Sequence, residues 1–373
     1  MSFKVKFEKI TCPSTARNFT MLIAALVIGT ALSSLTFLLK GVNPWLAVKK
    51  IFMGAFGSSL GINGTITKAI PLILIGSGLA VAYRGKFWNI GAEGQLLFGA
   101  TAATWVALSL PATIPGYLAI PLLFISGFVA GAVWCLIPGL LKLKFGINEA
   151  ISSLMLNYIA AEFVQYLIYG PWKGKSFSGF PVTEDFPDNA VLPYLSSSFF
   201  YGSRIHYHTL ILALISCVLL YFLITKTKRG YEIRTIGENP RAAQYAGMSF
   251  GKTVFIIATI SGGLAGMAGV GEVAGIHHHL TYPWAISSGY GFTAIITAFL
   301  AGLNPLGVII SSIFFGGILV GGDVIQTSLG LPFATVNIFN GMILFALIAK
   351  DYFLENRLIV TQTDQQQGAS RNG

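Results

Sequence analysis

The sequence predicts an all-α integral membrane protein with about ten transmembrane helices. Of its 373 residues, 54% are hydrophobic and only 10% are charged, whereas a soluble domain has about 25% charged residues. The mean hydropathy is +0.71, and the 43 glycines are of the kind that lets helices approach closely in lipid. Uncharged runs long enough to span a bilayer recur along the chain. A soluble globular protein is therefore excluded.

The predicted spans are the stretches without Asp, Glu, Lys or Arg, because a charge at the bilayer centre is costly. A crossing needs about 20 residues, so the runs 94–141 and 273–322 are each divided in two, near Pro111 and near Asn304. This gives a polytopic transmembrane domain over 19–351. Its spans are 19–39, 66–83, 91–110, 117–141, 148–170, 206–225, 252–275, 285–301, 306–322 and 334–350.

The distribution of positive charge predicts that both ends of the chain lie inside the cell. With ten crossings, 17 of the 24 lysines and arginines fall in inner segments, as the positive-inside rule requires. The largest inner segments are the tails 1–18 and 352–373 and the loop 226–251. The tail looks disordered from Thr361 onward. The lysine- and glycine-rich segment 40–68 is expected outside or at the interface.

Other classes of protein fit the sequence poorly. The net charge of +10 is spread over short loops, which argues against a nucleic-acid partner. The three cysteines are far apart and have no metal-ligand spacing. The tract His277-His278-His279 is expected to form an outer turn and not a metal site, because adjacent side chains point in different directions.

No complete phosphate-binding loop is present. The nearest match, Gly247 to Thr253, has three residues between its glycines, where a Walker A sequence needs four, and it follows no predicted strand. We therefore expect no catalytic residue and no cofactor bound by this chain. Any energy-converting reaction must take place on another subunit.

The run Asn89 to Gln95 interrupts the apolar pattern with polar residues and glycines. Non-helical backbone at membrane depth occurs where protein or a water-filled cavity surrounds it. A second such run, Ser287 to Thr293, hints at an internal repeat whose paired interruptions mark a transport site. The alternatives are an inner-surface turn with Glu93 in the first turn of a helix, and ordinary small-residue packing.

The span 148–170 carries a polar stripe, with Glu149, Ser152, Ser153 and Asn157 within an arc of roughly 140°. Such groups are costly in a membrane unless they face protein or water. The stripe is therefore predicted to line a pathway, or alternatively to form interhelical hydrogen bonds without a ligand. The predicted pathway residues are Asn89, Glu93, Gln95, Glu149, Ser153, Asn157 and Tyr158.

The inner loop has the pattern of a short capped helix. Asn239 suits the N-cap, Pro240 the first helical position, and Gly247 a left-handed C-terminal residue. The alanines between them favour helix. We predict that this helix docks on a partner, the alternative being a solvated loop helix. The predicted docking residues are Gly237, Glu238, Asn239, Pro240, Ala242, Ala243, Tyr245, Ala246 and Gly247.

At this loop the chain resembles the permease subunits of bacterial ATP-binding-cassette importers, in the branch shared by branched-chain amino acid, ribose and nucleoside systems. The resemblance extends from about residue 20 to 350 and includes Asn89–Gln95, Gly146–Glu149, Leu154–Tyr158 and Gly289–Phe292. This combination is most similar to nucleoside permeases. Leu303, before the Asn-Pro-Leu-Gly turn, departs from the arginine that relatives often carry there.

The resemblance implies a multi-pass permease subunit in the plasma membrane of a bacterium or archaeon, taking up nucleosides or similar small solutes. It implies three kinds of protein partner: a second permease subunit, identical or paralogous; ATPase subunits that hold ATP and magnesium; and an external substrate-binding lipoprotein that delivers the solute. The loop 226–251 would be the coupling loop to the ATPase. A sugar or branched-chain amino acid permease of the same family is the alternative.

Two rivals come from other classes of protein. In an ion-coupled secondary carrier, Glu93, Glu149 or Glu162 would take a proton or a sodium ion. A membrane scaffold would transport nothing. The absence of a phosphate-binding loop in the sequence and the docking-like helix favour the partner-dependent importer.

Overall fold

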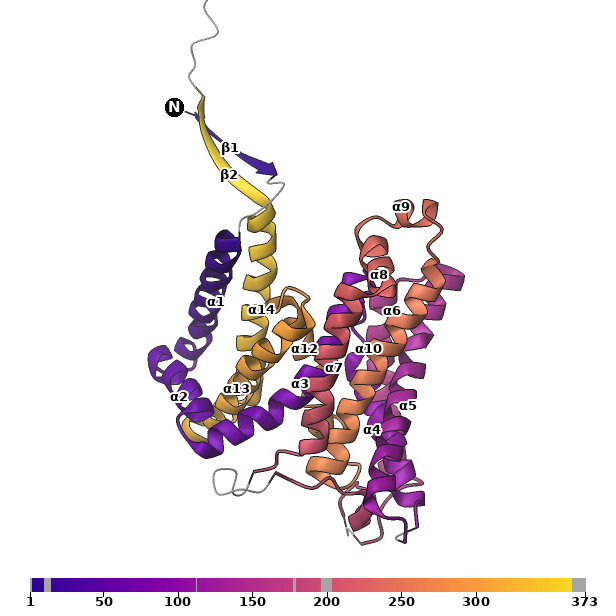
Figure 1. The fold of residues 1–373 in the computed structure, drawn as a ribbon. Helices are drawn as coiled ribbons and strands as arrows, with labels where there is room; N and C mark the ends of the chain where they lie inside the picture. Colours follow the sequence, from indigo (N-terminus) through magenta and orange to yellow (C-terminus); the bar gives the residue numbers. More distant parts are fainter. Residues whose placement is uncertain (1, 10–14, 112, 177–178, 196–202, 364–373) are drawn as a thin grey trace, which may run out of the picture. The chain divides into compact units, whose positions relative to one another are not determined.

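The computed structural model describes residues 2–9, 15–111, 113–176, 179–195 and 203–363 (Figure 1). The chain divides into two compact units. One consists of both ends of the chain, Met1–Val48 and Leu329–Gly373, and the other is Lys49–Ser328. Cys12 and the last ten residues of the predicted C-terminal tail, 364–373, lie outside the described residues.

The terminal unit pairs two helices, α1 (Thr15–Leu38) and α14 (Phe333–Glu355). Gly29 of α1 lies against Ile343 of α14, and a side chain at this glycine would meet the Ile343 backbone at 3.1 Å. Nearby, the Ser33 hydroxyl donates to the carbonyl oxygen of Phe339 at 3.1 Å. A small residue and a buried serine thus hold the two helices together, as is usual for helix pairs in lipid.

The two tails also form a strand pair, which the all-α prediction does not include. β1 (Ser2–Lys9) and β2 (Asn356–Thr363) are antiparallel, with Val5 opposite Val360 and Phe7 opposite Leu358. Both segments are rich in residues that favour strands, such as valine, isoleucine, phenylalanine and threonine. The tail predicted to be disordered from Thr361 therefore continues in β2 to Thr363.

The unit Lys49–Ser328 is a helical bundle. Six helical segments of the described chain are long and apolar enough to cross a membrane: Ser59–Arg84 (α3), Gly116–Phe145 (α5), Glu149–Tyr169 (α6), Tyr207–Lys226 (α7), Phe250–His277 (α10 with the π-helical turn η2) and Pro305–Leu329 (α13). The predicted multi-pass helical membrane protein is confirmed, whereas the number of ten crossings stays a prediction.

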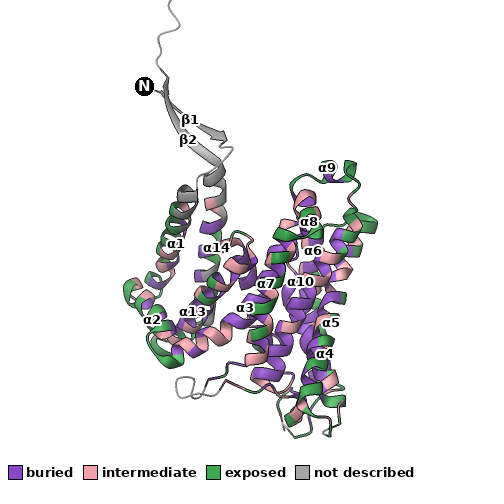
Figure 2. Ribbon diagram, viewed as in Figure 1, coloured by how far each residue is buried: buried purple, intermediate pink, exposed green. Residues whose placement is uncertain are grey.

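The core of this unit lies where α10 (Phe250–Glu272) meets α4 (Ala92–Ser109) and α5, and Figure 2 shows α3, α4 and α10 as largely buried. Glycines form these contacts. A side chain at Gly266 of α10 would overlap the carbonyl oxygen of Gly127 on α5, and one at Gly99 of α4 would overlap Gly266. Backbones can approach this closely only where both helices lack side chains at the contact.

Helix bounds differ from the predicted spans near charged residues, where the helices are longer than predicted. The segment 40–68 is largely helical, comprising α2 (Pro44–Phe56) and the first turns of α3. Lys68 lies inside α3 and Asp323 inside α13, where they form an ion pair. Pairing removes much of the penalty for a charge within a bundle, so the helices continue past these residues.

The predicted span 285–301 is divided into α11 (Pro283–Ser287) and α12 (Tyr290–Leu300). Between them Ser288 and Gly289 have positive φ angles of 45° and 74°. The predicted loop 226–251 consists mainly of α8 (Lys228–Glu238) and α9 (Pro240–Tyr245). The segment between α6 and α7 contains one 3₁₀ turn, η1 (Asp188–Ala190), among its described residues.

Candidate functional site

The predicted interruption of the helices is present, as a buried turn between α3 and α4. α3 ends at Arg84 and α4 begins at Ala92. Lys86 has a φ angle of 50°, a left-handed conformation that few non-glycine residues adopt. Asn89 is fully buried. The turn lies a few residues before the run predicted from the sequence, because Glu93 and Gln95 already belong to α4.

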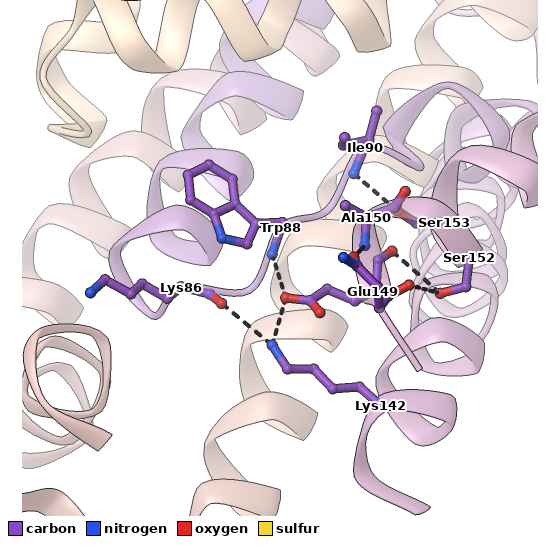
Figure 3. Close-up of polar contacts among 9 residues, drawn as sticks. Lys86, Trp88, Ile90, Lys142, Glu149, Ala150, Ser152 and Ser153 are labelled. Atoms are coloured by element: carbon purple, nitrogen blue, oxygen red, sulfur yellow. Dashed lines mark hydrogen bonds and ion pairs between the residues drawn. The ribbon is translucent and has the colours of Figure 1, made fainter. Parts of the chain in front are cut away.

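The polar stripe of α6 provides hydrogen-bond partners for this turn (Figure 3). Glu149 Oε1 accepts from the backbone N–H of Trp88 at 3.2 Å, and Ser153 Oγ accepts from that of Ile90 at 3.1 Å. Lys142, near the end of α5, forms an ion pair with Glu149. These groups satisfy backbone donors that a helix would otherwise have paired.

Asn157 makes two hydrogen bonds from the stripe to the segment that runs from the turn into α4. Its Oδ1 accepts from the N–H of Gly94 at 2.8 Å, and its Nδ2 donates to the carbonyl oxygen of Ile90 at 2.9 Å. Ser152 bonds its own helix through the carbonyl oxygen of Asn148, and Tyr158 is 55% exposed on another face of α6. The stripe and the interruption, predicted as two separate features, are therefore two sides of one contact.

A closed amide network fills the space behind the turn. Asn89 Nδ2 donates to Gln95 Oε1 and to Ser261 Oγ, both at 2.9 Å. Its Oδ1 accepts from Gln95 Nε2 at 2.8 Å and from the N–H of Gly91 at 3.0 Å. An amide group has two donor hydrogens and two acceptor positions, and all four are used in Asn89. This geometry favours a positioning role for Asn89 and Gln95.

Glu93 joins the two predicted interruptions. Its Oε2 accepts from the N–H of Gly291 at 2.6 Å, at the start of α12, and the side chain is fully buried. A carboxylate at a helix N-terminus is favoured by the unpaired amides and the helix dipole. A side chain at Gly291 would contact the backbone and the carboxyl group of Glu93, so only glycine fits. The segments 89–95 and 287–293 thus meet in space.

Replacing Asn157 with leucine should destabilise the turn. The change keeps the size of the side chain but leaves the Gly94 N–H and the Ile90 carbonyl oxygen without their partner. Each unsatisfied buried group costs about 1–3 kcal/mol. We expect a thermal midpoint several degrees lower for the purified Asn157→Leu protein than for Ser152→Ala, which alters an intrahelical bond of the same stripe. Equal midpoints would contradict this role.

The capped helix predicted in the inner loop is present as α9. Asn239 Oδ1 accepts from the N–H of Ala242 at 3.1 Å, and Pro240 occupies the first helical position. Gly247 has a φ angle of +74°, and no atom lies within 4 Å of the place that a side chain would take there. Ala243 is buried, whereas Tyr245 is 94% exposed. Short-range sequence signals therefore locate this helix correctly.

α8 connects α9 to the membrane helices. Gly237 packs against the carbonyl oxygen of Arg84 at the end of α3. The Nε of Arg84 donates to the carbonyl oxygen of Leu303, in the turn before α13, at 2.8 Å. Figure 1 shows α9 projecting from one end of this unit, beyond α8. α9 is therefore linked through α8 to the end of α3.

The histidines lie at the opposite end of the bundle. His278 Nε2 contacts the Tyr194 hydroxyl at 2.9 Å, and His279 Nδ1 contacts Asp185 Oδ1 at 3.0 Å. Phe186 N–H donates to the carbonyl oxygen of His278 at 2.8 Å. These contacts attach the segment between α6 and α7 to the turn after α10. They agree with the turn predicted at the histidine tract.

The stability of this end should depend on pH through His206, which lies immediately before α7. Burial lowers the pKa of His206 to about 4, from about 6.5 in an unfolded chain. The folded state thus keeps the ring neutral, and its full stability is present above pH 6.5. As the pH falls from 6.5 towards 4, the unfolded state takes up a proton first, and up to about 3 kcal/mol is lost.

We therefore expect the thermal midpoint of the purified protein to fall between pH 6.5 and pH 4. His206→Phe, which keeps an uncharged ring beside Gly275, should show a smaller fall. The nearby His208 is present in both the parent and the His206→Phe protein, so the difference between their pH profiles reports on His206. Identical pH profiles for the two proteins would contradict this account.

A group of charged residues within the helices was not among the predicted site residues. Lys68 of α3, Glu272 at the end of α10 and Asp323 of α13 are near one another, with Lys68 and Asp323 paired. Lys68 and Glu272 lie near the ends of the predicted spans 66–83 and 252–275, and Asp323 lies one residue beyond the span 306–322. The usable signal was a single charge with uncharged residues on both sides for more than a helical turn, which marks a functional position in a membrane protein.

Comparison with known proteins identifies the family. Residues 61–348 match the family described as branched-chain amino acid transport system / permease component. The chain belongs to this family. The permease is therefore a subunit of an ATP-binding-cassette transporter and not an enzyme, since ATP is hydrolysed on a separate subunit. Such a transporter includes ATPase and substrate-binding partners.

Several relatives match over most of their length. The permease is 35% identical to the glucose ABC transporter permease protein of Haloferax volcanii, covering 91% of this chain and 88% of that protein. It is 34% identical to the guanosine ABC transporter permease protein of Bacillus subtilis, covering 88% and 92%. It is 33% identical to the nucleoside ABC transporter permease protein of Lactococcus lactis, covering 90% and 92%. Each organism has a second, less similar permease, at 24 to 29% identity.

Proposed function

We propose that this permease belongs to an importer for nucleosides in the plasma membrane of a bacterium or archaeon. The support is the combination of family membership with relatives named for guanosine and for nucleosides that match nearly the whole chain. A sugar importer is the second candidate, favoured by the glucose permease relative. The two candidates share a chemical feature, because guanosine and glucose each carry a hydroxylated sugar ring.

The end of the bundle that carries α9 lies in the cytoplasm in this proposal. Lysines and arginines cluster there, on α8 and α9 and at the end of α5, as expected for the inner side of a membrane protein. The histidine end then faces outward. With ten crossings, both termini lie inside the cell.

α9 is the part of the permease that docks on an ATPase subunit. Of the predicted docking residues, those exposed on α9 and its flanks are Glu238, Asn239, Pro240, Ala242, Tyr245, Ala246 and Gly247. Ala243 and Gly237 are buried and hold the helix on the bundle. ATP and magnesium belong to the ATPase, and this chain binds no cofactor of its own.

The second permease of the complex is a paralogue. The support is that each of the three organisms has two different permeases similar to this one. An external binding lipoprotein delivers the solute. Of the predicted pathway residues, Glu149, Ser153 and Asn157 act with Asn89, Glu93 and Gln95 by holding the turn beside the pathway, and the exposed Tyr158 faces a neighbour or lipid.

The substrate can be tested with the complete transporter in proteoliposomes. We expect ATP-dependent uptake of radiolabelled guanosine that excess adenosine or uridine inhibits and that excess glucose or leucine does not. Uptake of glucose with no uptake of guanosine would replace the nucleoside proposal by the sugar importer. Uptake of leucine alone would contradict both.

A further inference from the structure

A polar cavity of about 300 Å³ lies within the bundle, nearer the histidine end. α3 contributes Asn63, Thr67 and Lys68, the end of α10 contributes Glu272, and α12 begins at the wall with Tyr290. Arg204, shortly before α7, lies at its edge. Small-molecule sites have volumes of about 300–1,000 Å³, so the cavity can hold a small solute or one ring of a larger one.

Two buried groups in this cavity are available to a ligand. The amide oxygen of Asn63 has no hydrogen-bond partner among the described residues, although the side chain is only 3% exposed. Glu272 is 4% exposed, and no hydrogen bond to its carboxyl group occurs within the described part of the chain. Buried polar groups without partners are rare and unfavourable. A bound hydroxyl group would satisfy either of them.

The charges around the cavity favour a neutral ligand. Lys68 forms an ion pair with Asp323, and the other two charged residues that line the cavity, Arg204 and Glu272, are of opposite sign. Hydroxyl groups both donate and accept, so they can bond a carboxyl group, an amide and an ammonium group placed around one small space. Tyr290 adds an aromatic side chain to the wall, and aromatic faces pack against flat, weakly polar rings.

Two chains of contacts lead from the cavity to the buried turn and to α8. Tyr290 precedes Gly291, whose N–H donates to Glu93 at the buried turn. α3 carries Asn63 and Lys68 near one end and contacts Gly237 of α8 at the other. A shift of α8 can therefore change the shape of the cavity.

We propose that this cavity binds the sugar ring of the transported solute, with Glu272 and Asn63 bonded to its hydroxyl groups. The inference rests on the proposed function and names the part of the substrate that this site recognises. It applies equally to a nucleoside and to a hexose. A free base or an amino acid lacks the hydroxyl groups that the two side chains require.

The test compares uptake of guanosine and of 2′,3′-dideoxyguanosine by the complete transporter. In Glu272→Gln and Asn63→Ala, we expect the KM for guanosine to rise by about ten-fold or more, since a hydrogen bond to a buried polar or charged group is lost. The preference for guanosine over the dideoxy analogue should fall by a similar factor. The same binding protein delivers both solutes throughout, so a change in preference between variants reports on the permease.

Glu162→Gln and Asn337→Ala are matched controls, because both side chains are exposed and neither lines the cavity. They should retain the parental preference. A parental preference in both cavity variants, or an equal rise in KM for the two solutes, would overturn the inference. Failure of the parent transporter to take up either guanosine or glucose would instead contradict the proposed function.

A second measurement tests the inference even if Glu272→Gln and Asn63→Ala fail to assemble into the transporter. Thr67→Cys in the intact complex should react with a methanethiosulfonate reagent faster than the parent protein does, because Thr67 lines the cavity. Guanosine or glucose should slow this reaction, and guanine and leucine should not. Protection by leucine or guanine, or by none of the four solutes, would overturn the inference.

Discussion

Replacing Gly266 with valine is expected to prevent folding of the permease. A side chain at this position would overlap the carbonyl oxygen of Gly127, and Gly99 and Gly131 also lie against it. Three helices meet there, so none can move away without opening the core. The cost should reach at least about 4 kcal/mol, near the upper end of single-substitution effects. We expect little monodisperse protein in detergent extracts of cells that produce Gly266→Val.

Gly341→Val provides the control for this prediction. Gly341 lies in α14, and no atom is within 4 Å of the place that a side chain would take there, so the same substitution changes helix propensity without a steric clash. This variant should be extracted in nearly parental amounts. A well-folded Gly266→Val protein would mean that the contact between α4, α5 and α10 is looser than the structure indicates.

Tyr245→Ala should abolish most coupled uptake while leaving the permease folded. The ring is 94% exposed on α9 and is available as an anchor for the ATPase. Interface anchors of this type contribute about 2 kcal/mol or more, which corresponds to roughly a thirty-fold loss of affinity. The measurement is co-purification with the ATPase, together with substrate-stimulated phosphate release. Tyr117→Ala, with a ring 75% exposed in the first turn of α5, should leave both unchanged.

Gly247→Val should act on the same interface through the backbone. Gly247 has a φ angle of +74°, which costs a β-branched residue about 1–2 kcal/mol and should shift the end of α9. Asparagine tolerates this conformation better, so Gly247→Asn should retain most ATPase association. Parental association in both Tyr245→Ala and Gly247→Val would show that α9 is not the docking element.

The parts of the fold that depend on neighbouring residues could be predicted from the sequence. α9 is an example, because the N-cap at Asn239, the proline at the first position and the left-handed Gly247 all act within one turn of the helix. The buried turn before α4 could also be located, since polar residues and glycines break an apolar run. In both cases the physical cause lies within a few residues of its effect.

The contacts between distant segments could not be predicted in the same way. The stripe of α6 and the turn after α3 are separated by more than a complete helix, and only the fold shows that Asn157 bonds Gly94. Lys68 and Asp323 were placed near the ends of predicted spans because each is costly in lipid alone, although pairing makes them acceptable inside a bundle. β1 and β2 pair from opposite ends of the chain.

The most direct test of the central claim compares the energy sources for uptake. The permease would be reconstituted alone, and also with its second permease, ATPase and binding protein, in vesicles with a proton or sodium gradient or with ATP. An ATP-driven permease subunit should give nucleoside uptake only in the complete complex with ATP, and this uptake should persist when ionophores collapse the gradients. Accumulation by the chain alone, driven by an ion gradient without ATP, would contradict the account and identify a secondary carrier.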